Sequence, residues 1–189
     1  MASATLPIET SSESTPRTLR MVAEGLAASL DQLMEVVESL GDEQYRQAPV
    51  GEVSSSIGRH VRHCLDHVRL LLVGAERGNL DYDERPRGTS IETDRRESLA
   101  TLRSLIRQVR ALGCVRDQTL ELRTIVAADQ PPIRVQTSLG RELAFVLSHT
   151  IHHGALIAVM ARTLRSPVPE RFGYAPATLA YLEGNRCVR

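Results

Sequence analysis

The residues best suited to chemistry in this 189-residue chain are its six histidines, which occur in only two short stretches. A lone histidine is usually a surface side chain or a hydrogen-bonded core side chain. Six confined to two stretches are more typical of a metal site, because neutral imidazole is a common ligand of divalent cations. The upstream stretch holds His60, His63 and His67, and the downstream stretch holds His149, His152 and His153.

The downstream stretch contains a pair with helical spacing. His149 and His153 are four residues apart within a long apolar run, 139–160, so in a helix they share one face, one turn apart. Two imidazoles at that spacing can hold a divalent metal between them. His152 lies about 100° round the helix from His153, which favours a supporting, core or interface role for His152.

The upstream stretch would supply the third imidazole. A helical wheel spreads His60, His63 and His67 over about 60°, so periodicity alone leaves all three open. The wheel places His60 and His67 closer to the apolar sector than His63. Three protein nitrogens leave a coordination position free for water or substrate, which is typical of a catalytic site. Zinc, nickel and iron(II) all accept neutral imidazole.

Glu142 is the acidic residue nearest to the downstream pair along the same face. It lies two turns before His149, about 10 Å along a helix axis, which is too far for the two side chains to share a metal. Two roles remain open for Glu142: orienting another histidine of the cluster, or pairing with an arginine.

The elements that must position these histidines are four long helices. Apolar residues recur at helical spacing over 16–40, 57–77, 94–112 and from Thr137 or Ser138 to about 164. Alternating apolar residues over 119–137 predict a short β-hairpin, and 176–182 predicts a short C-terminal helix. The pattern therefore predicts an all-α protein, a four-helix bundle. In an up-down-up-down arrangement the second and fourth helices would point the same way, with His63 and His149 at a similar level.

The domain organisation expected from the sequence is simple. Residues 1–14 are rich in Ser, Thr and Glu and are predicted to be a flexible tail. Residues 15–189 are long enough for one domain with its own core. The fifteen-residue connection 79–93 is dense in charge, and connections of this length are often functional.

Composition excludes several kinds of function. The formal net charge is zero, so no binding to nucleic acid or to a membrane surface is expected. All 23 basic residues are arginine, which excludes a Schiff-base lysine and a phosphate-loop lysine. Three scattered cysteines do not form a disulfide framework and favour the cytoplasm. We expect neither a secretory signal nor an apolar segment of membrane-spanning length.

Two segments of this sequence resemble the DinB/YfiT-like family. They are Ser56–His63, which reads Ser-Ile-Gly-Arg-His-Val-Arg-His, and His149–Gly154, which reads His-Thr-Ile-His-His-Gly. Family members are four-helix bundles of about this size, with one ligand histidine from helix two and an HxxxH pair from helix four. The resemblance therefore implies a divalent metal held by His63, His149 and His153.

The sequence departs from the family pattern after the downstream pair. Gly154-Ala155-Leu156 stands where the family often has Arg-Gly-Gln, and His60 and His67 are additional histidines in helix two. The segments Tyr82–Arg85 and Phe172–Pro176 also resemble those of a DinB-like subgroup.

The resemblance implies an enzyme that acts on a small molecule. Its metal would activate water, as in a hydrolase, or a low-molecular-weight thiol cosubstrate, as in a thiol S-transferase. The alternative is a non-catalytic metal-binding or stress-related binding protein whose site is structural or vestigial. The fourth helix is apolar nearly all round, which predicts that neighbouring helices or a second subunit in a homodimer cover it.

Overall fold

The computed structural model describes residues 14–48, 55–86 and 88–184, and in this part the chain is mainly helical, as predicted. Apart from residue 14, the predicted tail lies outside the described residues. The four predicted long helices and the C-terminal helix are present, together with a short helix, α2, that the sequence did not predict. The helices are α1 (Ser14–Ser39), α2 (Asp42–Arg46), α3 (Ile57–Arg77), α4 (Arg95–Leu112), α5 (Leu139–Thr163) and α6 (Pro176–Leu182).

The two helices that carry the histidines begin and end at residues suited to these positions. The Ser56 side chain caps α3 by accepting a hydrogen bond from the Arg59 amide, and Gly78 ends that helix in a left-handed conformation with φ of 76°. Ser138 caps α5 in the same way, by accepting from the Arg141 amide. These caps fix where the two helices begin and where α3 ends.

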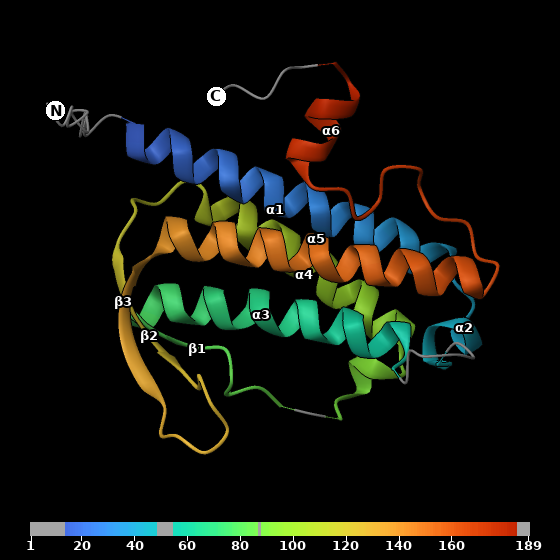
Figure 1. The fold of residues 1–189 in the computed structure, drawn as a ribbon, viewed down its shortest axis with the longest axis horizontal. Helices are drawn as coiled ribbons and strands as arrows, with labels where there is room; N and C mark the ends of the chain where they lie inside the picture. Colours follow the sequence, from blue (N-terminus) through green and yellow to red (C-terminus); the bar gives the residue numbers. More distant parts are fainter. Residues whose placement is uncertain (1–13, 49–54, 87, 185–189) are drawn as a thin grey trace, which may run out of the picture.

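The four long helices pack in pairs around a shared apolar core. Both α1 and α3 contact α4 on one side and α5 on the other (Figure 1). Leucine and valine side chains supply most of the core, which holds these helices together by removing apolar surface from water. Among the fully buried residues are Leu26, Leu30, Val61, Leu65, Leu102, Val109, Leu143 and Val146.

The directions of the helices differ from the up-down-up-down expectation. α3 and α5 lie side by side and run in opposite directions, whereas α4 runs parallel to α3 (Figure 1). The reason is the connection between α3 and α4, which returns along α3 to the end where that helix began. At Gly58 it comes so close that a Cβ atom would lie 2.1 Å from the Glu92 carbonyl oxygen. This contact requires glycine at the start of α3.

A small sheet covers the end of the molecule where α3 stops. It contains β1 (Asn79–Asp81), β2 (Thr119–Thr124) and β3 (Ile133–Ser138) in the order β1-β2-β3. The predicted hairpin is confirmed, because β2 pairs antiparallel with β3 with Leu122 opposite Val135. The parallel β1–β2 pair was not predicted, nor was the single turn of 3-10 helix at Ser90–Glu92.

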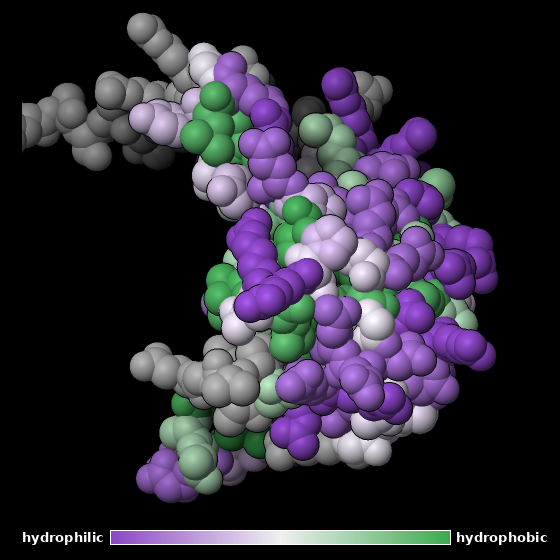
Figure 2. Space-filling model, turned by 90° about the vertical axis from the view of Figure 1, so that its right-hand side faces the viewer, coloured by the Kyte–Doolittle hydropathy of each residue, from purple (hydrophilic) through white to green (hydrophobic). Residues whose placement is uncertain are grey.

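The opposite end of the molecule is closed by hydrogen bonds from the α1–α2 region. Gln44 Nε2 donates to the Leu164 carbonyl oxygen at 3.0 Å, and Ser39 Oγ donates to the Pro167 carbonyl oxygen at 3.2 Å. Seen from this end, the surface is mostly hydrophilic with scattered hydrophobic residues (Figure 2).

Helix α5 is less enclosed than its composition suggested. By length and mean hydropathy it would pass as a membrane span, so the expectation that no segment reaches this length was too strict. Core helices of soluble proteins pass the same test, and α5 packs against α1 and α3. Its outer side stays exposed at Ser148, His152, Ala155 and Val159, so within one chain α5 is not covered all round.

Candidate metal centre

Five of the six histidines converge where α3 and α5 lie side by side. Because the helices are antiparallel, the first histidine of α3 faces the last of α5. His60 Nδ1 and His153 Nδ1 are 2.9 Å apart, and His63 Nε2 and His149 Nε2 are also 2.9 Å apart. The structure therefore brings together the three predicted ligands, His63, His149 and His153.

The closest group of ligand atoms includes a histidine that the family resemblance did not select. Nitrogens of His63, His67 and His149 all lie within 4.8 Å of one another. Around a tetrahedral zinc with bonds of 2.0–2.1 Å, ligand nitrogens are about 3.3 Å apart. Small side-chain rotations would bring these three nitrogens to that spacing, so the residues present fit a divalent metal.

His67 is the most firmly positioned of these imidazoles. Its Nδ1 lies 3.0 Å from the His63 carbonyl oxygen, which can only accept, so Nδ1 carries the proton and donates. The Nε2 lone pair is then available to a metal. The ring is buried and stacks on Tyr82, with ring centroids 5.0 Å apart, and on His149, with centroids 4.2 Å apart.

Glu142 supports the cluster through Tyr82 and touches no histidine directly. The Tyr82 hydroxyl donates to Glu142 Oε2 at 3.0 Å, and Thr137 Oγ1 donates to Glu142 Oε1 at 2.7 Å. Arg141 lies 3.7 Å from the same carboxylate. Of the two roles expected of Glu142, the structure shows the pairing with an arginine, and it links Glu142 to His67 only through the Tyr82 ring.

The remaining histidines occupy distinct positions. The His153 ring lies 4.5 Å from the His149 ring and 4.6 Å from the His63 ring, so it belongs to the same cluster. His60 Nε2 is buried without a hydrogen-bond partner in the described residues. His152 is exposed and contacts only the edge of His153, at 5.4 Å between centroids, within the described part of the chain.

The surroundings hold these imidazoles in their neutral form. Burial is the main cause that lowers the pKa of His63 to about 2, of His149 to about 4 and of His153 to about 3. Neighbouring histidines add to each shift, and the positive charge of Arg85 adds to those of His63 and His149. Near pH 7 the rings therefore keep the lone pairs that a metal requires.

An ion-pair network lies beside the cluster on α3. Asp66 accepts from Arg62 at 2.9 Å and from Arg69 at 3.2 Å, and Arg62 also pairs with Glu92 at 2.8 Å. The Asp66 side chain is buried, and the two guanidinium groups satisfy its carboxylate.

Cys64 is not a nucleophile in this site. Its side chain is fully buried, and burial raises the pKa of its thiol to about 12. At neutral pH it therefore packs as a small apolar side chain.

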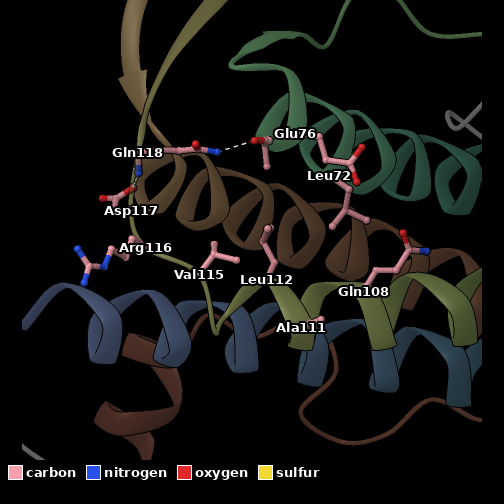
Figure 3. A pocket seen from close by; sticks show the side chains of 10 residues that line it. Leu72, Glu76, Gln108, Ala111, Leu112, Val115, Arg116, Asp117 and Gln118 are labelled. Atoms are coloured by element: carbon pink, nitrogen blue, oxygen red, sulfur yellow. Dashed lines mark hydrogen bonds between the residues drawn. The ribbon is translucent and has the colours of Figure 1, made fainter.

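A sizeable cavity lies on another side of α3, away from the imidazoles. It measures about 620 Å³ and is open between α3, α4 and the chain leading to β2. Figure 3 shows Leu72 pointing from α3 toward Leu112 and Val115 across this space. The Gln118 amide donates a hydrogen bond to the Ala75 carbonyl oxygen at one edge of it. Leu72 is nine residues after His63, about 180° round the helix. The cavity and the histidine cluster therefore do not meet.

Comparison with known proteins identifies the family. The sequence pattern of the DinB superfamily matches residues 26–157, from α1 through most of α5, and this region includes all six histidines. A curated relative, FK506-binding protein 5 from Rhizopus delemar, is 34% identical over 107 residues, which is 55% of this chain and 28% of that protein. The chain thus spans less than a third of that relative's length. No solved structure matches the chain. The match over most of its length shows that the chain belongs to the DinB superfamily.

Proposed function

We propose that the histidine cluster binds one divalent metal ion and that the protein is a metal-dependent enzyme acting on a small molecule. The observation that carries this proposal is the convergence of neutral imidazoles from two antiparallel helices, three of them with nitrogens within 4.8 Å of one another. Membership of the DinB superfamily supports it. We also infer that the four long helices are the four-helix bundle of the DinB/YfiT type.

His63 and His149 are ligands in both arrangements that we consider. The third is His153 according to the family resemblance, or His67 according to the spacing of the nitrogens. The fixed tautomer and stacked ring of His67 favour it physically, because both reduce the entropy lost when a metal binds. Zinc, nickel and iron(II) all suit such a nitrogen donor set.

A bound cation of this kind lowers the pKa of a water or thiol that reaches it, which provides a nucleophile near neutral pH. This suits a hydrolase or a transferase that uses a low-molecular-weight thiol. The role of the protein is to keep the imidazoles neutral and in place. The Phe145 ring, 5.7 Å from His149 and 5.4 Å from Tyr82, walls one side of the cluster against water.

Elemental analysis of the purified protein tests the metal site. We expect about one divalent metal per chain for a single three-imidazole site. His63→Ala and His149→Ala should each abolish uptake, whereas His152→Ala, the exposed neighbour, should not change it. Comparing His67→Ala with His153→Ala identifies the third ligand. Full metal content in both His63→Ala and His149→Ala would contradict the proposal.

A second candidate is a non-catalytic metal-binding or stress-related protein. It is favoured by the number of imidazoles, because five are enough to fill all four positions of a tetrahedral ion and leave none for substrate. X-ray absorption on the metal-loaded protein distinguishes the two. A site with four nitrogen ligands and no exchangeable ligand supports the structural role, whereas three nitrogens and thiol-dependent turnover support the enzyme.

We further propose that the protein is a cytoplasmic homodimer. The outer side of α5 leaves Leu156 37% and Val159 58% exposed, and a second copy would cover this apolar strip. Light scattering at micromolar concentration tests the dimer, and a monomeric mass would contradict it.

A further inference from the structure

Arg85 lies in the connection between α3 and α4, on a segment fixed over the histidine cluster. Three residues earlier Tyr82 stacks on His67 and bonds to Glu142. One residue later the Pro86 carbonyl oxygen accepts a hydrogen bond from Arg62 Nη1 at 2.9 Å. The Arg85 backbone therefore sits between two attachments to the core, and its own amide donates to the Asp83 carbonyl oxygen at 3.0 Å.

The side chain of Arg85 is half-buried. Its neighbours in the chain hold it beside the cluster, because Tyr82 stacks on His67 and the Pro86 carbonyl oxygen bonds to Arg62, which directly precedes His63. Among the described residues no carboxylate lies within ion-pair distance of Arg85, although Asp83 and Glu84 precede it directly.

The carboxylates around the cluster are already engaged elsewhere. Asp66 accepts from Arg62 and Arg69, and Glu142 accepts from Tyr82 and Thr137. Neutral imidazoles bring no negative charge to a divalent cation. A metal-loaded site would therefore combine the charge of the ion with that of Arg85, and a half-buried positive charge is costly until an anion pairs with it.

We propose that Arg85 recognises a carboxylate on the small molecule that approaches the histidine cluster. The guanidinium fork matches the two oxygens of one carboxylate, which makes one arginine sufficient for this group. The proposal rests on the proposed metal site and specifies its substrate or cosubstrate class. A thiol that carries a carboxylate would place its sulfur toward the imidazoles and its charged end on Arg85.

Two thiols of similar size provide the test on cobalt-loaded protein. 3-Mercaptopropionate carries a carboxylate and 2-mercaptoethanol does not, and binding of either thiol is followed by the sulfur-to-cobalt absorption band. We expect the wild-type chain to bind 3-mercaptopropionate about tenfold more tightly, which is about 1.4 kcal/mol, since hydrogen bonds between oppositely charged groups are stronger than those between neutral groups.

Variants of Arg85 test whether the preference for 3-mercaptopropionate over 2-mercaptoethanol depends on this residue. Arg85→Gln should reduce it to within about threefold while leaving the affinity for 2-mercaptoethanol unchanged, and Arg85→Lys should keep part of it, because lysine keeps the charge and loses the fork. Arg59→Gln is the matched control, because Arg59 is an exposed arginine of α3 that pairs with Glu92. An unchanged preference in Arg85→Gln, or an equal loss in Arg59→Gln, would overturn the proposal.

A separate measurement distinguishes this proposal from the metal site itself. Propionate binding to metal-free protein, followed by ligand-observed NMR, depends on Arg85 and requires no metal. Loss of propionate binding in Arg85→Gln supports the role of Arg85 even if the protein takes up no metal. No binding of propionate to the wild-type chain, or equal binding of inorganic phosphate, would count against carboxylate recognition.

Discussion

The two sides of α3 show how different a chemical site and an empty space can be. On the side facing α5, three histidines meet two more, and the rings contact one another at centroid distances of 4.2–5.2 Å. On the side facing α4, Leu72 and Ala75 line a cavity of about 620 Å³ (Figure 3). One helix thus supplies both a dense cluster of ligand atoms and the wall of the cavity.

The difference shows which property points to chemistry. The cavity is lined by apolar side chains together with polar ones such as Glu76, Gln108 and Gln118, and these polar side chains point in different directions (Figure 3). The histidine cluster has convergent nitrogens, strongly lowered pKa values and a support from Tyr82 and Glu142. Convergence of perturbed ionisable groups is the better guide to a functional site here than volume.

Removing a ligand from one side of α3 should have the largest effect. We expect His63→Ala or His149→Ala to weaken cobalt binding at least about 100-fold, because two imidazoles hold a divalent ion far less well than three. Leu72→Ala, on the cavity side of the same helix, should leave cobalt affinity within about threefold while lowering thermal stability. Cobalt titration followed by absorbance measures both, and an equal loss in Leu72→Ala would erase the distinction between the two sides.

Removing the support behind His67 should have a smaller effect on metal binding. Tyr82→Ala deletes the ring that stacks on His67, and we expect about a tenfold loss of cobalt affinity, as is usual when a ligand loses its positioning partner. Tyr82→Phe keeps the ring and loses only the hydroxyl bonded to Glu142, so its cobalt affinity should stay within about threefold. If both variants bind cobalt like the wild type, His67 is not a ligand.

Local features of this fold and site could be predicted from the sequence. The i, i+4 spacing placed His149 and His153 on one face. The capping residues before 57 and at Thr137 or Ser138 marked the starts of the two helices that carry the histidines, and the structure selects Ser56 and Ser138. These features depend on residues close to one another in the chain, where the helix repeat fixes the geometry.

Features that depend on distant residues could not be predicted in the same way. The antiparallel relation of α3 and α5 follows from the path of the connection that packs at Gly58, and this contact has no periodic signal. The position of His67 depends on the Tyr82 ring that stacks on it. Tyr82 in turn bonds to Glu142, which lies 60 residues after Tyr82 in the chain. The three residues of β1 are too few to show an alternating pattern. The length and charge of the 79–93 segment, and the resemblance of Tyr82–Arg85 to a DinB-like subgroup, indicated that Tyr82 and Arg85 could matter without showing how.

Acid should destabilise the metal-free protein, because the histidines between α3 and α5 are held neutral in the folded state. The folded-state pKa values of His63, His149 and His153 lie below the value of about 6.5 expected in the unfolded chain. Below pH 6.5 the unfolded state therefore binds more protons, and stability falls as the pH drops toward about 4. Each histidine lowers the free energy of unfolding by at most about 1.4 kcal/mol for each pH unit. The real change is smaller, because these rings are half-exposed and solvent screens their charge.

Urea unfolding between pH 7.5 and 5 measures this slope. His63→Asn combined with His149→Asn should reduce this slope, because two of the groups that gain protons on unfolding are removed. Saturating zinc should also oppose acid unfolding down to the pH at which protons displace the metal. A wild-type stability that does not change between pH 7.5 and 5 would show that the rings are not held neutral.

Filling the cavity should have the smallest effect on both protein stability and cobalt affinity. Ala111 lines the α4 side, and Ala111→Leu adds apolar volume where open space can receive it. We expect the free energy of unfolding to change by no more than about 0.5 kcal/mol, as for most substitutions at exposed positions. Cobalt affinity should stay within about twofold, because α3 lies between the filled space and the imidazoles. A tenfold loss of cobalt binding in Ala111→Leu would mean that α3 transmits packing changes from one side to the other, and the two regions would then act as one.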